Sequence, residues 1–367
     1  MRIGITYNVK KDSDITGNLS ESELQPASNS SAEKFLDENL IKNYPDRLDD
    51  TFAEWDSMET IEAVRNALEQ YGHSVELIEA DKEAFRKLSE LNNDFIFNVA
   101  EGFGGVSRES QIPSMLEMLG IPFTGSDSIT TGICHDKSRC KEILSYYGIP
   151  NAPFLITDDE KISVSSNGYP KFVKPLHEGS SKGIYNSSVV NNPAELHSEI
   201  SRIKQCYGQP AIVEDFLPGK EFTVSMLGNG DGSKVLPVVE INLDSVPEGF
   251  NKIYSYEVKW FFDTRENKLD IFKCPADVSS SLYKEIENVC LNAYRCLRIR
   301  DWARIDVRLD SNNVPNIVEI NPLPGILPDP ADNSCYPKAA REFGLDYNAM
   351  INAVLEEAVS RSKSMMC

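Results

Sequence analysis

The chain has 367 residues, 41% of them hydrophobic, which is enough for two or three domains that each bury a core. Its formal net charge of −20 repels a phosphate backbone over most of the surface, so we expect neither nucleic acid nor anionic membrane as a partner. A local cationic pocket could still hold one nucleotide. The eight cysteines show no C-x-x-C pair and no zinc spacing, which favours reduced thiols in a cytoplasmic chain.

The amino-terminal residues predict a buried strand over 1–7, with no long apolar core or small-residue cleavage site typical of a signal peptide. No stretch has the roughly 18 apolar residues that a membrane span requires. Residues 8–50 are rich in Ser, Asn, Asp and Glu and are expected to form a solvated, partly disordered insertion.

The next elements alternate between strand and helix. Apolar residues recur at helical spacing over 58–71, and SVELIEA over 74–80 alternates as a strand does. A further strand is expected over 94–102, and its carboxyl end is where open α/β sheets bind ligands. This order predicts a parallel α/β layer at the amino terminus.

Helical and strand signals continue through the middle of the chain. We expect a helix over 111–119 that ends at Gly120, a short strand over 121–126 and one helix over 130–147. PKFVKP is a short strand bounded by prolines, and the segment 209–228 holds two strand-like runs around a Pro-Gly turn.

The carboxyl-terminal part begins with a predicted helix over 279–297. The strands ARIDVRL and NIVEINP follow, joined by the turn residues SNN, and an amphipathic helix is expected over 347–361. The fold class is therefore α/β, with mixed α+β character.

The segment KPLHEGSSKG, residues 174–183, could form a phosphate cradle. A lysine ends a strand, and small residues then let backbone N–H groups approach an anion. An ordinary glycine- and serine-containing loop has the same composition, and the segment fits neither the phosphate-loop nor the dinucleotide pattern. His177 in this loop is the only histidine of interest, with a solvated side chain as the simpler interpretation.

The two strands near the carboxyl end carry the clearest chemical signal. Alternation places Arg304, Asp306 and Arg308 on one face, with Glu319 and Asn321 on the neighbouring strand. Two carboxylates and an amide suit Mg²⁺, and an arginine beside them could stabilise charge on a phosphoryl group. The alternative is a surface sheet with solvated charges, but the intervening isoleucines and valines indicate burial.

Glu214 and Glu221 flank the turn LPG. Carboxylates at such a turn can accept hydrogen bonds from ribose hydroxyls or an exocyclic amine, although surface glutamates would look the same.

Taken in order, several segments resemble the D-alanine:D-alanine ligase family of the ATP-grasp superfamily. They are EMLGIPFTGS with HDK, KPLHEGSSKG, VEDFLPGKEFTV, YSYEVKW, ARIDV, VEINPLPG and SCYPKAA, spread over about 95–355. The resemblance implies an ATP-grasp fold behind an amino-terminal α/β domain. The implied parts are 1–125, 126–210 and 211–367, with ATP held between the second and third.

The resemblance also implies the roles of individual residues. Nucleotide contacts are implied for eight residues. Phosphates are bound by Lys137, Lys174 and Lys259, the adenine amine by Glu214 and the ribose by Glu221. Phe216 lies along the base, and the mobile loop carries Ser180 and Ser181. Magnesium, with Mn²⁺ as an alternative, is implied at Asp306, Glu319 and Asn321. Arg304 and the backbone of Gly325, with Ser180 and Lys259, match the catalytic centre, and Ser334 matches the group that binds the second substrate's carboxylate.

The resemblance weakens where the family binds its amino substrate. The glycine-rich motif and glutamate after the first strand are absent, Glu101 replaces a histidine, and Trp260 replaces a tyrosine. The stretch between Gly325 and Ser334 is longer than usual. We therefore expect a ligase for a small carboxylate and amine other than two D-alanines, compatible with a homodimer. A genuine D-alanine:D-alanine ligase and a non-catalytic nucleotide-binding protein are the alternatives.

Overall fold

The computed structural model describes residues 1–9, 54–102, 104–159, 161, 162, 164, 168–259, 269 and 271–365. Nearly all of the predicted insertion 8–50, and Trp260, lie outside the described residues. Within the described chain, no helix is long and apolar enough to cross a membrane.

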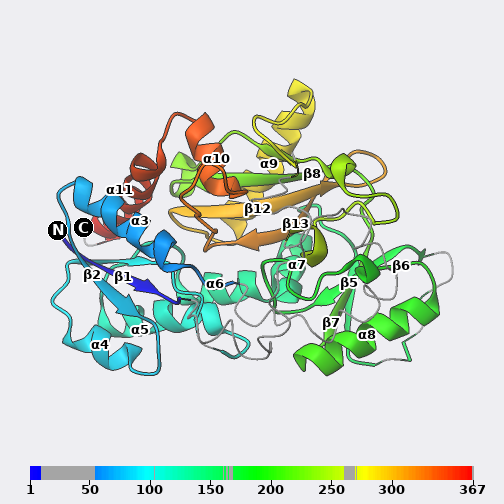
Figure 1. Cartoon of the computed structure of the whole chain (residues 1–367), viewed down its shortest axis with the longest axis horizontal. Helices are drawn as coiled ribbons and strands as arrows, with labels where there is room; N and C mark the ends of the chain where they lie inside the picture. The colour runs from blue at the N-terminus through cyan, green and yellow to red at the C-terminus, as the bar shows by residue number, and fades with distance from the viewer. Residues whose placement is uncertain are drawn as a thin grey trace, which may run out of the picture.

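The amino-terminal part is a parallel sheet of strand order β2-β1-β3, as the βαβ pattern predicts. It lies beside its helices in blue and cyan in Figure 1. Its elements are β1 (Arg2–Tyr7), α3 (Met58–Gln70), β2 (Ser74–Glu79), α4 (Ala84–Glu90), β3 (Phe95–Asn98), the short 3-10 helix η2 (Arg108–Ser110) and α5 (Gln111–Leu119). The expected strand over 121–126 is reduced to a single bridge between Ile96 and Phe123.

The residues 130–147 form two helices and not the single helix expected. These are α6 (Ser128–His135) and α7 (Lys137–Tyr146), and the break falls at Asp136, whose ψ of 99° is extended. The Asp136 carboxylate accepts hydrogen bonds from the backbone N–H groups of Ser138 and Arg139, so it caps α7. The break places Lys137 at the first turn of α7.

The central part is a four-stranded antiparallel sheet of order β4-β7-β5-β6, shown in green in Figure 1. Its elements are β4 (Phe154–Thr157), β5 (Lys171–Pro175), β6 (Val189–Val190), α8 (Pro193–Tyr207) and β7 (Ala211–Asp215). The predicted boundary before residue 211 cuts β7 away from the sheet in which it pairs with β4 and β5. We therefore propose a boundary after β7.

The carboxyl-terminal part is a six-stranded sheet of order β11-β10-β8-β12-β13, with β9 paired to β8. Its strands are β8 (Glu221–Leu227), β9 (Lys234–Val235), β10 (Val239–Ile241), β11 (Phe272–Lys273), β12 (Trp302–Leu309) and β13 (Pro315–Asn321). Its helices are α9 (Ser280–Cys296), α10 (Cys335–Glu342) and α11 (Tyr347–Met365). The two runs around the Pro-Gly turn thus belong to different sheets, so this turn carries the chain from the second sheet to the third.

One hydrophobic core joins the two ends of the chain. Ile61 and Leu68 of α3 are fully buried in the same cluster as Ile351 and Val354 of α11. The Asn352 amide adds a hydrogen bond of 2.9 Å to the carbonyl of Ala67. Figure 1 shows α3 and α11 side by side with both termini close together. The amino-terminal layer is therefore packed against the carboxyl-terminal part.

The seven cysteines of the described chain are free thiols. Cys134, Cys140 and Cys290 are buried in the core beneath α7 and α9. This agrees with their interpretation as reduced thiols, and these three contribute to the core.

Candidate active site

A cavity of about 490 Å³ lies where the three parts meet. Its wall draws Glu101 from the amino-terminal part, Lys174 and Glu214 from the second sheet, and Thr223 and Arg304 from the third. Most of the predicted site residues line it: Glu101, Lys174, Ser180, Ser181, Glu214, Phe216, Glu221, Lys259, Arg304, Asp306, Glu319, Asn321, Gly325 and Ser334. Lys137 reaches the same wall through Glu319. Sequence positions from 101 to 334 are thereby brought to one place.

Glu214 lies between two buried lysines at one end of the cavity. Its carboxylate oxygens are 3.2 Å from Nζ of Lys141 and 3.3 Å from Nζ of Lys174. Burial favours the protonated acid, but the two lysines outweigh burial and lower the pKa of Glu214. Burial lowers the pKa of Lys174, which Glu214 partly offsets. The pattern of strand ends predicted Lys174, whereas Lys141 on α7 was missed as an ordinary helix-surface residue.

Phe216 and Glu221 are joined through Arg308. The Arg308 guanidinium lies 5.1 Å from the centroid of the Phe216 ring and donates a hydrogen bond of 2.8 Å to Glu221. Burial raises the pKa of Glu221, an effect that Arg308 opposes. Alternation along β12 had placed Arg308 on the face of Arg304 and Asp306, but no role had been assigned to it.

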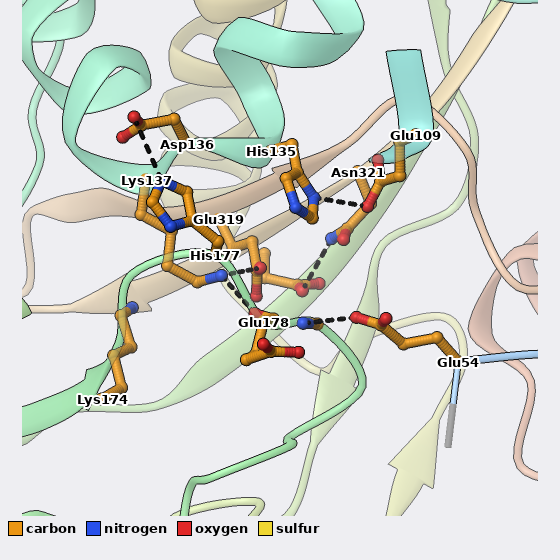
Figure 2. A network of polar contacts seen from close by, with 12 residues as sticks. Glu54, Glu109, His135, Asp136, Lys137, Lys174, His177, Glu178, Glu319 and Asn321 are labelled. Carbon is orange, nitrogen blue, oxygen red and sulfur yellow. Dashed lines mark hydrogen bonds and ion pairs between the residues drawn. The ribbon is translucent and has the colours of Figure 1, made fainter. Parts of the chain in front are cut away.

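The three predicted metal ligands lie together on facing positions of β12 and β13. Asp306 pairs in register with Glu319, and the amide of Asn321 lies 3.4 Å from the Asp306 carboxylate. Nζ of Lys137 is 3.0 Å from Glu319, and Arg304 donates two hydrogen bonds to Asp306. Figure 2 shows Lys137 directed at both Glu319 and the carbonyl of Glu178.

The charges at this centre are fixed by their neighbours. Burial works against ionisation of Glu319, yet Lys137 and Lys174 lower its pKa to about 2. Burial likewise disfavours the Arg304 cation, but Asp306 raises the pKa of Arg304. An anionic Glu319 and a cationic Arg304 therefore persist at neutral pH.

The glycine-rich loop has an unusual backbone. Ser180 and Ser181 have φ angles of 50° and 61°, in the left-handed region that is uncommon for residues other than glycine. Oγ of Ser181 donates to the carbonyl of Tyr254 at 3.0 Å. At Gly183 a Cβ atom would lie 2.4 Å from the Pro175 ring, so this close packing requires glycine. The loop is thus held in one shape by contacts outside it.

His177 in this loop is half-buried and not solvated. Its Nε2 is 3.3 Å from Asp136, and its ring stacks on His135 with centroids 6.2 Å apart. Burial lowers the pKa of His177. His135 in turn contacts Glu109 at 2.7 Å. Figure 2 shows both histidines, with the His177 ring directed at Asp136.

Four carboxylates also line the cavity, Glu54, Asp56, Glu101 and Glu109, and we name the part that they line the acidic end. Burial and the other three carboxylates raise the pKa of Glu101 well above the usual carboxyl range. Arg108 forms its ion pair with Glu54, at 2.6 Å, and has none with Glu101 among the described residues. The sequence alone left open that Glu101 pairs with Arg108, and the structure shows no such ion pair between these two described residues.

Ser334 holds the extended loop that follows Gly325. Its Oγ donates to the carbonyl of Gly325 at 3.2 Å and accepts from the N–H of Leu327 at 3.1 Å. Ser334 and Gly325 thus lie in direct contact.

Sequence reasoning missed Glu54 and Arg108. Glu54 follows the polar stretch, where one glutamate among many gives no signal. Arg108 lies in the run VSRES, and the sequence suggests it only as a possible partner of Glu101. Both side chains are mostly buried at the edge of the site.

The comparisons with known proteins agree with this geometry. The family described as D-ala D-ala ligase C-terminus matches residues 143–356. The chain is 32% identical over 84% of its length to Uncharacterized protein y4sG of Sinorhizobium fredii, covering 89% of that protein. It is also 32% identical over 80% of its length to D-alanine–D-alanine ligase of Actinobacillus pleuropneumoniae serotype 5b, covering 90% of that protein.

A solved structure shares the fold. The D-alanine–D-alanine ligase from Bacillus anthracis complexed with ATP superposes with a TM-score of 0.69 at 21% identity, covering 100% of this chain and 99% of that one. The chain therefore belongs to the D-alanine:D-alanine ligase-like family of the ATP-grasp superfamily and is an ADP-forming carbon–nitrogen ligase.

Proposed function

We propose that this ligase phosphorylates a small carboxylate with ATP and joins it to an amine through the acyl phosphate. The observation that carries the proposal is a shared cavity: residues matched to nucleotide contacts and residues matched to the reaction centre line the same space. A carboxylate is a poor electrophile, and phosphorylation converts one of its oxygens into a leaving group. The amine can then attack the activated carbonyl carbon.

The nucleotide is assigned to the end of the cavity around Glu214. Glu214 would accept from the adenine amine, with Phe216 along the base and Glu221 at the ribose. Lys137, Lys174 and Lys259 would bind phosphates, beneath the loop that carries Ser180 and Ser181. The buried charges of Lys137 and Lys174, now directed at Glu319 and Glu214, support this assignment.

Magnesium fits the donor set at Asp306, Glu319 and Asn321, with Mn²⁺ as the alternative. No group of three or more His, Cys, Asp or Glu residues gathers for a metal in the described part of the chain, so the Asn321 amide is needed to complete the set. Hard oxygen ligands are those that Mg²⁺ prefers. When bound, the ion would offset phosphate charge during an in-line displacement.

Arg304 and the Gly325 backbone are proposed to stabilise the negative oxygen that develops when the amine attacks. The raised pKa of Arg304 keeps its positive charge available at any working pH. The glycine-rich loop, with Ser180 at its centre, would exclude water from the activated acyl group. Ser334 would bind the α-carboxylate of the second substrate.

The proposed substrates are amino-acid-like, but not two D-alanines. Glu101 lines the acidic end, where its neighbours are other carboxylates. Such a site favours a first substrate with a cationic or hydroxyl group near its acid. A buried site discriminates strongly because an unpaired polar group costs about 1–3 kcal/mol.

D-alanine:D-alanine ligation is the second candidate, because several relatives carry that name. Incubating the protein with ATP, Mg²⁺ and D-alanine, alongside a panel of L- and D-amino acids and small carboxylic acids, separates the two. We expect another pair to give more product by mass spectrometry. Dipeptide formation from D-alanine that exceeds every other pair would reject the proposed specificity.

Turnover itself is tested by ADP release. We expect ADP only when a carboxylate and an amine are both supplied. A protein that binds ATP but releases no ADP with any pair would instead be a non-catalytic nucleotide-binding protein. The homodimer and the cytoplasmic location stay predictions.

A further inference from the structure

Arg108 connects the amino-terminal part to the glycine-rich loop. From η2, its guanidinium donates a hydrogen bond of 3.0 Å to the carbonyl of His177, the residue that opens the loop. The same side chain lies 3.0 Å from Nε2 of His135 and 3.6 Å from the Glu178 carboxylate. Its strongest partner is Glu54, with hydrogen bonds of 2.6 and 2.8 Å. One arginine thus contacts the loop, α6 and the segment before α3.

Glu54 also contacts the loop directly. Its carboxylate accepts a hydrogen bond of 2.6 Å from the backbone N–H of Gly179. A Cβ atom on Gly179 would lie 2.7 Å from the same oxygen, so the approach depends on glycine. Figure 2 shows Glu54 reaching toward Glu178 and its loop from a distant segment. The loop is therefore held on both its carbonyl and its N–H side.

The buried ion pair of Arg108 and Glu54 contributes little to stability, which indicates a geometric role. The side chains of Arg108 and Glu54 are only 12% and 9% exposed. Burying two opposite charges gives little net stability, because desolvation offsets their attraction. Bidentate and charge-assisted hydrogen bonds do, however, fix orientation well. The next residues, Ser180 and Ser181, have left-handed backbones that require support from their surroundings.

We propose that Arg108 and Glu54 are positioning residues that hold the glycine-rich loop in the shape that receives the triphosphate of ATP. This inference rests on the proposed nucleotide site. Arg108 fixes the carbonyl of His177, and Glu54 fixes the N–H of Gly179, so Ser180 and Ser181 are presented to the phosphates. The shape of the glycine-rich loop thereby depends on the amino-terminal part, although Glu101 of that part is proposed to contact the carboxylate substrate and not ATP.

The test compares a triphosphate with a monophosphate. Binding of a non-hydrolysable ATP analogue with Mg²⁺, and of AMP, is measured by calorimetry for the unaltered protein, Arg108→Gln and Glu54→Gln. Both variants should bind the analogue about tenfold more weakly, the loss of roughly one charge-assisted hydrogen bond. AMP binding should not change, because the adenine and ribose contacts lie elsewhere. A purely structural role would weaken both ligands alike.

Arg361→Gln is the matched control. Arg361 is similarly buried, pairs with Asp301 at 2.8 Å and donates to the carbonyl of Phe123, but it does not contact the loop. Thermal unfolding shows whether each variant is folded. If Arg108→Gln does not fold, Glu54→Gln alone carries the test. Unchanged or tighter analogue binding by the Glu54 variant would overturn the inference, since tighter binding means that the carboxylate competes with phosphate. If the unaltered protein binds no analogue, the proposed nucleotide site itself is wrong.

Discussion

Glu101 at the acidic end of the cavity differs from the carboxylates around the nucleotide end in how its charge is neutralised. Around the nucleotide end, Glu214 and Glu319 each have a lysine within 3.3 Å, and Glu221 has Arg308 at 2.8 Å. At the acidic end, Glu101 has no ion pair among the described residues and lies near three other carboxylates.

This difference separates what the protein shares with its family from what it does not. Paired charges are held in a fixed orientation by their hydrogen bonds and can exchange one partner for a phosphate or metal. An unpaired carboxylate in a cavity is unfavourable until a ligand supplies a donor. Glu214, Glu221 and Glu319 match the family's ATP and metal residues, whereas Glu101 is one of the departures from the family. The acidic end is therefore where the proposed specificity is best tested, and the other end is where the proposed nucleotide site is best tested.

The largest expected loss of activity comes from a substitution of Glu319 at the nucleotide end. Glu319→Gln should reduce turnover roughly a thousandfold, because the proposed metal loses a carboxylate worth several kcal/mol. Steady-state ADP release at saturating Mg²⁺ measures this loss. Glu240→Gln is a suitable control, since Glu240 is a buried glutamate paired with Lys220 outside the cavity. Near-normal ligation by the Glu319 variant would disprove the metal assignment.

Arg304→Ala should lower kcat roughly a hundred- to a thousandfold with little change in ATP affinity. The reason is that the proposed partner charge of Arg304 develops only during the reaction. The kcat and the dissociation constant for ATP are measured in parallel. An equal loss in both quantities would show that Arg304 acts in nucleotide binding.

Glu101→Gln is expected to change the acidic end alone. It should lower kcat/KM for a cationic first substrate about tenfold or more, because a charge-assisted hydrogen bond becomes a neutral one. ATP affinity should stay the same. Kinetics on the best substrate pair from the panel test this, and a parallel fall in ATP affinity would show that the two ends are not separate.

The smallest expected effect is on stability against pH. The pKa of Glu101 is raised in the folded protein, so the folded state binds the proton more tightly than the unfolded state does. Stability from this group is present below the usual carboxyl pKa and is lost as pH rises through the raised pKa. Glu101→Gln should therefore unfold at a higher temperature than the unaltered protein at neutral pH.

Below the usual carboxyl range this difference in unfolding temperature should vanish, because both side chains are then neutral. Calorimetric scans of the two proteins across pH measure it without any substrate. A constant difference at all pH values would mean that Glu101 is not the titrating group.

The sequence by itself determined the elements whose signal is local. Alternation predicted β12 and β13, and it placed Asp306 and Glu319 on strands that prove to pair in register. Helical spacing predicted α3 and α9 because one face of each is buried. Motif order was sufficient for the family and the ATP-grasp fold.

Only the tertiary structure decided which distant residues meet. The break between α6 and α7 depends on the Asp136 side chain, which caps α7 in place of a continuous helix. The spacing of apolar residues carries no sign of this cap. The runs of β7 and β8 read alike, yet they join different sheets because their pairing partners lie far along the chain. Glu54 and Arg108 carry no local pattern. Their role arises from long-range contacts between charged groups, which the sequence records only as two ordinary polar residues.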